Sequence, residues 1–136
     1  MSDPETTEIL LIEDNPRDAE LFIRALKKKN LASHIFHAED GVDAIDFLFG
    51  RGKYAGHTLT GNLKVILLDI KLPRIDGLEV LKIIKTDKRT CSIPVVVITS
   101  SAEDLDILQA YKLGVNSFIT KPVEFDAFIE AISIVG

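Results

Sequence analysis

Short apolar runs alternate along this chain with longer segments in which apolar residues recur every three or four positions. The runs at residues 9–12 and 65–68 are continuously apolar, which is typical of strands covered on both faces of a sheet. After Asn15 and Pro16, apolar residues follow the spacing of a helix with one buried face (Ala19, Phe22, Ile23 and Leu26). Strand and helix patterns alternate five times, which predicts parallel strands joined by right-handed crossovers.

The pattern predicts five strands and five helices in one α/β domain. The strands are expected near residues 8–13, 34–38, 64–69, 95–98 and 115–119, and the helices after Asn15, over 40–49, around Leu78 to Ile84, over 101–114 and over 124–135. Residues 50–62 are polar and rich in glycine, so they predict a loop, with a continuation of the second helix as the alternative. We expect a doubly wound five-stranded parallel sheet, a flavodoxin-like three-layer sandwich, with the favoured strand order 2-1-3-4-5.

Length and composition narrow the functional classes. A chain of 136 residues suits one domain, which we expect at residues 8–136 after a flexible lead at 1–7, with no output domain. The net charge of -5 argues against nucleic acid or an anionic membrane as the main partner. A single cysteine, Cys91, excludes an internal disulfide and indicates a reducing compartment. No signal peptide or membrane-spanning run is visible, so we expect a cytoplasmic protein.

Carboxylate, hydroxyl and ammonium side chains stand at the ends of four of the predicted strands. Glu13 and Asp14 follow the first and Asp69 ends the third, while Thr99 ends the fourth and Lys121 follows the fifth. In an open parallel sheet the carboxyl ends of the strands line one edge, where ligands bind. Each residue alone is more often a helix cap or a turn, but their joint placement, about one strand–helix unit apart, favours a single site.

The predicted set of side chains suits a divalent cation together with a phosphoryl group. Mg²⁺ prefers oxygen ligands and keeps several waters, so few protein carboxylates suffice. A central carboxylate can act as a nucleophile and form an aspartyl phosphate. An ammonium and a hydroxyl would then contact the phosphoryl oxygens. A histidine metal site is not expected, because His34 and His37 lie three apart on a strand and face opposite sides.

Four motifs resemble the receiver domain of two-component response regulators. They are Ile-Glu-Asp-Asn at 12–15, Leu-Leu-Asp-Ile-Lys-Leu-Pro at 67–73 with Asp-Gly at 76–77, Ile-Thr-Ser-Ser at 98–101 and Thr-Lys-Pro at 120–122. The resemblance covers essentially the whole chain and implies the α/β sandwich already expected. It implies a phosphoacceptor signalling protein, not an enzyme in its own right, whose partner is a histidine kinase.

The resemblance also implies a role for each matching residue. Asp69 would be the phosphoacceptor, and Mg²⁺ or Mn²⁺ would be held by Glu13, Asp14, Asp69 and the backbone carbonyl of Lys71. Thr99 would be the switch hydroxyl and Lys121 the phosphate-binding lysine. The aromatic switch position falls on Phe118, which lacks the phenolic hydroxyl that is common there, and Ser100 sits where a small residue is usual.

The resemblance further implies an output surface and a kind of kinase. Phosphorylation would change the surface made by the fourth helix, fifth strand and fifth helix, where a partner or a second copy would bind. Apolar residues expected there are Leu105, Leu108, Tyr111, Leu113 and Phe118. Residues 47–54 and 119–123 are similar to small single-domain regulators paired with bacterial phytochromes, so we expect a phytochrome histidine kinase.

Three alternatives compete with this interpretation. A phosphatase of the haloacid dehalogenase type would want a second acid two residues after Asp69, where Lys71 stands. A flavin-binding domain would need a phosphate-cradling loop after the first strand, where two acids would instead repel phosphate. A receiver-fold adaptor that works without phosphorylation stays open.

Overall fold

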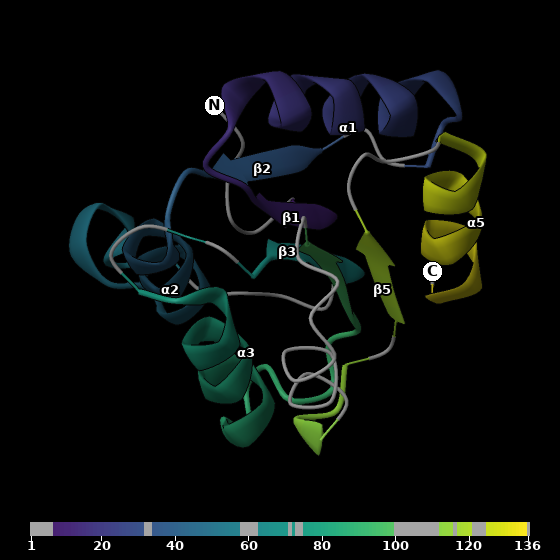
Figure 1. Ribbon diagram of the computed structural model, residues 1–136. Helices are drawn as coiled ribbons and strands as arrows, with labels where there is room; N and C mark the ends of the chain where they lie inside the picture. The colour runs from purple at the N-terminus through teal and green to yellow at the C-terminus, as the bar shows by residue number, and fades with distance from the viewer. Residues whose placement is uncertain are drawn as a thin grey trace.

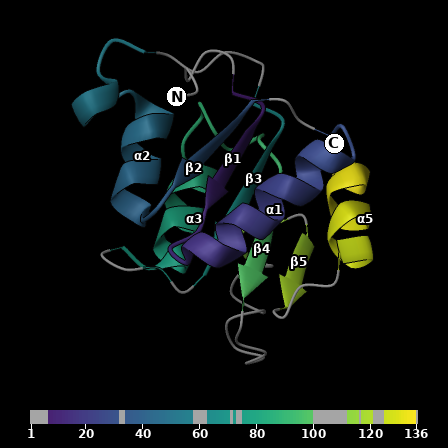
Figure 2. The same ribbon diagram turned by 90° about the horizontal axis from the view of Figure 1, so that it is seen from above.

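One parallel sheet runs through the middle of the molecule. The computed structural model describes residues 7–31, 34–57, 63–70, 72, 75–99, 112–115, 117–120 and 125–135. Within them, five parallel strands lie in the order β2-β1-β3-β4-β5, which confirms the predicted sheet and its strand order (Figures 1 and 2). The strands are β1 (Ile9–Ile12), β2 (Ile35–Ala38), β3 (Val65–Asp69), β4 (Val95–Thr99) and β5 (Ser117–Thr120).

Helices cover both faces of this sheet. The described helices are α1 (Pro16–Lys28), α2 (Gly41–Phe49), the 3-10 helix η1 (Gly52–Tyr54), α3 (Gly77–Thr86) and α5 (Phe125–Val135). Helices α1 and α5 lie on one face, with α2 and α3 on the other (Figures 1 and 2). Most of the helix predicted over 101–114 falls outside the described residues, as do residues 1–6 of the predicted lead. None of the described helices is long and apolar enough to cross a membrane.

Alternate residues of each strand pack under different helices, which explains the continuous apolar runs. On β1, Leu10 and Ile12 belong to the core beneath α2 and α3, while Ile9 and Leu11 belong to the core beneath α1 and α5. All four side chains are at most 2% exposed. A polar residue at any of these positions would have to be buried, and a buried polar group without a partner is costly.

Side-chain caps start two helices directly at the carboxyl edge of the sheet. Asn15 Oδ1 accepts hydrogen bonds from the backbone N–H groups of Arg17 (2.9 Å) and Asp18 (3.2 Å), and Pro16 occupies the first helical position. Asp40 Oδ1 accepts from the N–H of Asp43 at 2.8 Å. Both caps use residue types that favour helix starts. They keep the turns after β1 and β2 short, so the residues between strand and helix stay at the edge.

The segment after α2 contains more structure than its composition predicted. Gly50 ends α2 in the left-handed region (φ 63°), and η1 then brings Tyr54 back over the sheet. The Tyr54 ring packs edge-on against Phe36 and Phe47, each at 5.5 Å between centroids. Its hydroxyl donates to Asp43 Oδ1 at 2.9 Å. Burial, and then this bond to the Asp43 carboxylate, raise the pKa of Tyr54 well above its usual range.

Gly77 lies against the backbone at the end of β3. Its N–H donates to the carbonyl of Ile70 at 2.8 Å. A Cβ at this position would overlap the carbonyl oxygen of Asp69 together with Cα and the carbonyl oxygen of Ile70. Only glycine allows α3 to begin this close to the strand end, so the glycine of the Asp-Gly pair at 76–77 has a steric reason.

We expect Tyr54 to keep its proton at a pH where an exposed tyrosine has lost it. An ordinary phenol titrates near pH 10. Because the folded pKa is raised, the stabilisation is complete below that pH, and it falls as pH rises through the folded pKa. Absorbance at 295 nm should therefore show one of the two tyrosines ionising only as the protein unfolds. Tyr54→Phe should remove that late step, whereas joint ionisation of both tyrosines near pH 10 would contradict the assignment.

We expect Gly77→Ala to destabilise the protein by about 1–3 kcal/mol, the usual cost of overpacking. The clash is with backbone, and it should outweigh the gain of about 1 kcal/mol in helix propensity. Urea denaturation measures the change, with Lys82→Ala on the exposed face of α3 as the control within about 0.5 kcal/mol of wild type. A Gly77→Ala variant as stable as this control would show that the strand end can shift freely.

Candidate functional site

Three carboxylates meet at the carboxyl edge of the sheet. Glu13 and Asp14 follow β1, and Asp69 is the last residue of β3. Parallel pairing sets Ile12 beside Leu68, so the next residue of each strand carries its acid to the same level of the edge. Ligand oxygens of Glu13, Asp14 and Asp69 all lie within 4.8 Å of one another. The structure thus brings together the three acids that the sequence placed at one edge.

Burial raises the electrostatic cost of holding these three carboxylates close together. Glu13 is fully buried and Asp69 is 3% exposed, whereas Asp14 is exposed. Two carboxylates about 4 Å apart repel by about 4 kcal/mol at an effective dielectric of 20. A divalent cation would relieve this repulsion, and oxygen is the ligand that Mg²⁺ prefers. The exposed side of the cluster leaves room for the waters that such a cation keeps. The donor set therefore fits a hydrated divalent cation.

Hydrogen bonds hold the turn that carries Glu13 and Asp14. The Glu13 N–H continues the ladder with β2 by donating to the carbonyl of Ala38 at 3.1 Å. Glu13 Oε2 accepts from the N–H of Asn15 at 3.2 Å, and the Glu13 carbonyl accepts from His37 Nε2 at 2.7 Å. From the sequence, His37 is expected only not to form a metal-binding pair with His34. The contact of His37 with the Glu13 carbonyl depends on the pairing of β1 with β2, and the local sequence pattern does not predict that pairing.

The other predicted site residues are described in part or not at all. Thr99 ends β4, and its backbone pairs with that of Thr120 on β5. For Thr99 and Phe118 the description covers the backbone alone. Lys71, Ser100 and Lys121 lie outside the described residues. Of the predicted pocket, the described side chains are thus those of the acidic half, Glu13, Asp14 and Asp69.

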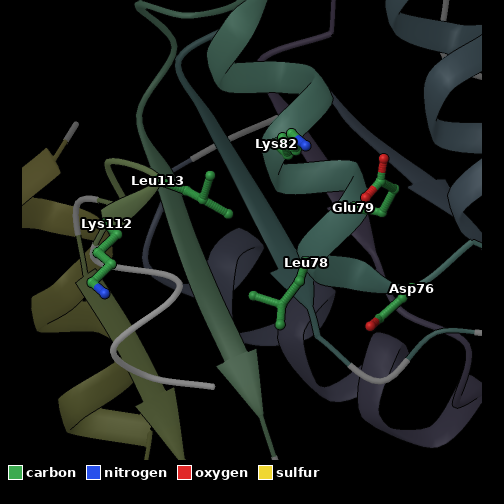
Figure 3. A pocket seen from close by; sticks show the side chains of 6 residues that line it. All are labelled: Asp76, Leu78, Glu79, Lys82, Lys112 and Leu113. Atoms are coloured by element: carbon green, nitrogen blue, oxygen red, sulfur yellow. The ribbon is translucent and has the colours of Figure 1, made fainter. Parts of the chain in front are cut away.

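A separate hollow of about 490 Å³ lies beside α3. Its described lining residues are Asp76, Leu78, Glu79, Lys82, Lys112 and Leu113 (Figure 3). The side chains of Leu78 and Leu113 extend toward the space between α3 and the segment 112–113 (Figure 3). Leu113, expected as part of the apolar output surface, is partly buried and packs against the core. Leu105, Leu108 and Tyr111 lie outside the described residues. The three acids do not line this hollow, so it is distinct from the acidic cluster.

Comparison with known proteins identifies the family that the sequence motifs resemble. The model of the response regulator receiver domain matches residues 9–133. Among curated relatives, the probable methanogenesis regulatory protein FilR2 of Methanothrix harundinacea is 41% identical over 118 residues, 87% of this chain and 74% of that protein. Response regulator Rcp1 of Synechocystis is 38% identical over 113 residues, 83% of this chain and 75% of that protein.

Solved structures agree with this family in fold and in sequence. The bacteriophytochrome response regulator AtBRR superposes with a TM-score of 0.82 at 49% identity, covering 98% of this chain and 94% of that one. The Mn²⁺-bound form of Rcp1 superposes with a TM-score of 0.78 at 34% identity, covering 95% and 88%. This chain is therefore similar to one protein described as a bacteriophytochrome response regulator, at 49% identity, and to another described as a probable methanogenesis regulatory protein, at 41% identity.

The family accounts for the features described above. Its members are phosphoacceptor signalling proteins of two-component systems and not conventional enzymes, and a divalent cation is typical of their acidic pocket. The strand order and the three acids at the sheet edge are those expected of its fold. This chain belongs to the response regulator receiver family.

Proposed function

We propose that this protein accepts a phosphoryl group on Asp69 from a histidine kinase, in a reaction that requires a divalent cation. The observation that carries the proposal is the cluster of Glu13, Asp14 and Asp69 within 4.8 Å. In the transfer, a carboxylate oxygen of Asp69 attacks the phosphorus of a phosphohistidine. The phosphorus–nitrogen bond breaks, and the leaving imidazole nitrogen takes up a proton. The product is an aspartyl phosphate.

The acidic residues are proposed to prepare this transfer. Glu13, Asp14, Asp69 and the Lys71 carbonyl would hold Mg²⁺ or Mn²⁺, which would supply positive charge to the phosphoryl oxygens. Asp69 is nearly buried, so charges placed around it act in a poorly solvated pocket. Glu13 is fully buried and bonded to the turn, which suits a residue that shapes the site. The exposed Asp14 is the better direct ligand to a cation that retains water.

A second set of residues is proposed to sense the phosphoryl group. Lys121 would neutralise a phosphoryl oxygen, and the hydroxyls of Thr99 and Ser100 would donate to the group. The pairing of Thr99 with Thr120 supports this, because Thr120 directly precedes Lys121. Phe118 has no phenolic hydroxyl, so its ring would respond to the shift of the residues around the phosphoryl group through packing alone. The output would be a changed surface formed by the predicted fourth helix, β5 and α5, which a partner or a second copy would bind.

The proposed donor is a phytochrome histidine kinase, and the proposed location is the cytoplasm. The likeness to AtBRR, at 49% identity over nearly all of both chains, supports a phytochrome as the sensor. FilR2 shares 41% identity with the chain under a different description, so overall similarity does not select the kinase by itself. The single exposed Cys91 suits a reducing compartment.

Intact mass spectrometry with a small phosphodonor and Mg²⁺ tests the phosphoacceptor. We expect one phosphoryl group on wild type, none on Asp69→Asn, and none on wild type once a chelator has removed the metal. Asp76→Asn, which removes an exposed acid outside the cluster, is the matched control and should be labelled like wild type. Labelling of Asp69→Asn would move the acceptor elsewhere. An unlabelled wild type would favour the phosphorylation-independent adaptor.

Phosphotransfer from purified kinases tests the proposed donor. The second-order rate constant of phosphotransfer should be at least about tenfold higher for a phytochrome kinase than for sensor kinases of other classes. A tenfold ratio corresponds to about 1.4 kcal/mol in transition-state binding. Asp69→Asn serves as the blank in each reaction. A faster donor of another sensor class would rule out the phytochrome pairing and leave the phosphoacceptor role intact.

A further inference from the structure

We propose that His37 is a positioning residue for the acidic site, because its ring holds the peptide that joins Glu13 to Asp14. The inference rests on the proposed function and extends it to a residue outside the acidic cluster. His37 lies on β2, one residue before that strand ends. Its role would be to orient the carboxylates toward a bound cation without touching the cation.

The His37 ring makes a hydrogen bond to the Glu13 backbone through its Nε2 atom. Nε2 lies 2.7 Å from the carbonyl oxygen of Glu13. A carbonyl only accepts hydrogen bonds, so Nε2 carries the hydrogen and donates. The neighbouring residue Ala38 accepts from the N–H of Glu13 at 3.1 Å. The end of β2 therefore holds Glu13 at both its N–H and its carbonyl, the first through backbone and the second through a side chain.

Fixing this carbonyl also fixes the start of Asp14. The carbonyl of Glu13 and the N–H of Asp14 belong to one planar peptide unit, so an oriented carbonyl orients the amide that follows. On the other side of Asp14, the N–H of Asn15 donates to Glu13 Oε2, and Asn15 caps α1. Asp14 is exposed, so packing does not immobilise it. The two bonds on either side restrict it instead, which lowers the entropy lost when a cation binds.

The position could instead be a half-buried aromatic that only fills space. Substitutions separate the two roles. Gln places an N–H donor at a reach close to that of Nε2, so His37→Gln should keep the bond. Leu fills a similar volume without a donor, so His37→Leu should lose it. Asn carries a donor on a shorter side chain, so His37→Asn is a polar variant that also loses the bond if His37→Leu fails to fold.

Mn²⁺ titration of these variants, by calorimetry or electron paramagnetic resonance, measures the effect. We expect His37→Leu and His37→Asn to bind Mn²⁺ about three- to tenfold more weakly than wild type, the scale of one hydrogen bond that supports a metal ligand. His37→Gln should stay within about twofold. In metal-free protein, amide hydrogen exchange at Asp14 and Asn15 should be faster in the first two variants and unchanged in His37→Gln.

Two results would overturn the inference. One is wild-type affinity and wild-type exchange in both His37→Leu and His37→Asn, and the other is equal weakening in all three variants, which would indicate a loss of ring packing. A wild type that binds no Mn²⁺ would count against the proposed function. The exchange rates in metal-free protein would still test whether His37 holds the turn, so the two failures are distinguishable.

Discussion

The parallel pairing of β1 with β3 is the constraint on which the site depends. It places Glu13 and Asp14 beside Asp69, although more than 50 residues separate them along the chain. The pairing is maintained against their repulsion by strands whose side chains are buried on both faces of the sheet. Apolar burial thus pays the electrostatic cost of gathering three acids, two of them shielded from water, at one point.

Much of this arrangement is predictable from local sequence, because helix caps and buried strands have short-range patterns. The continuous run at Ile9–Ile12 indicates a strand covered on both faces, and Asn15 with Pro16 indicates where α1 begins. Once these elements are ordered, the rule that ligands bind at the carboxyl edge places Asp69 near Glu13 and Asp14. The predicted acidic cluster followed from topology combined with the chemistry of the strand ends.

The remaining features depend on contacts that local patterns do not encode. His37 contacts Glu13 only because β2 pairs with β1 in one register, and a histidine on a strand gives no sign of that partner. Tyr54 stands in a glycine-rich polar segment, yet its ring joins Phe36 and Phe47 from two other elements. The need for glycine at position 77 arises from the backbone of β3. Each of these depends on where a distant segment comes to lie.

The strand order separates a stiff region of the molecule from a compliant one. Among the described strands, β1 and β3 each have a partner on both sides, whereas β2 and β5 lie at the two margins and each has one partner. A marginal strand of four residues can shift by breaking the bonds on one of its sides, and an inner strand must break those on two. The acids therefore occupy the part of the sheet that resists distortion, and small displacements cost least at the two marginal strands, β2 and β5. A charge that arrives at the acids can change the surface of the molecule at a marginal strand while the inner strands around that charge stay in place.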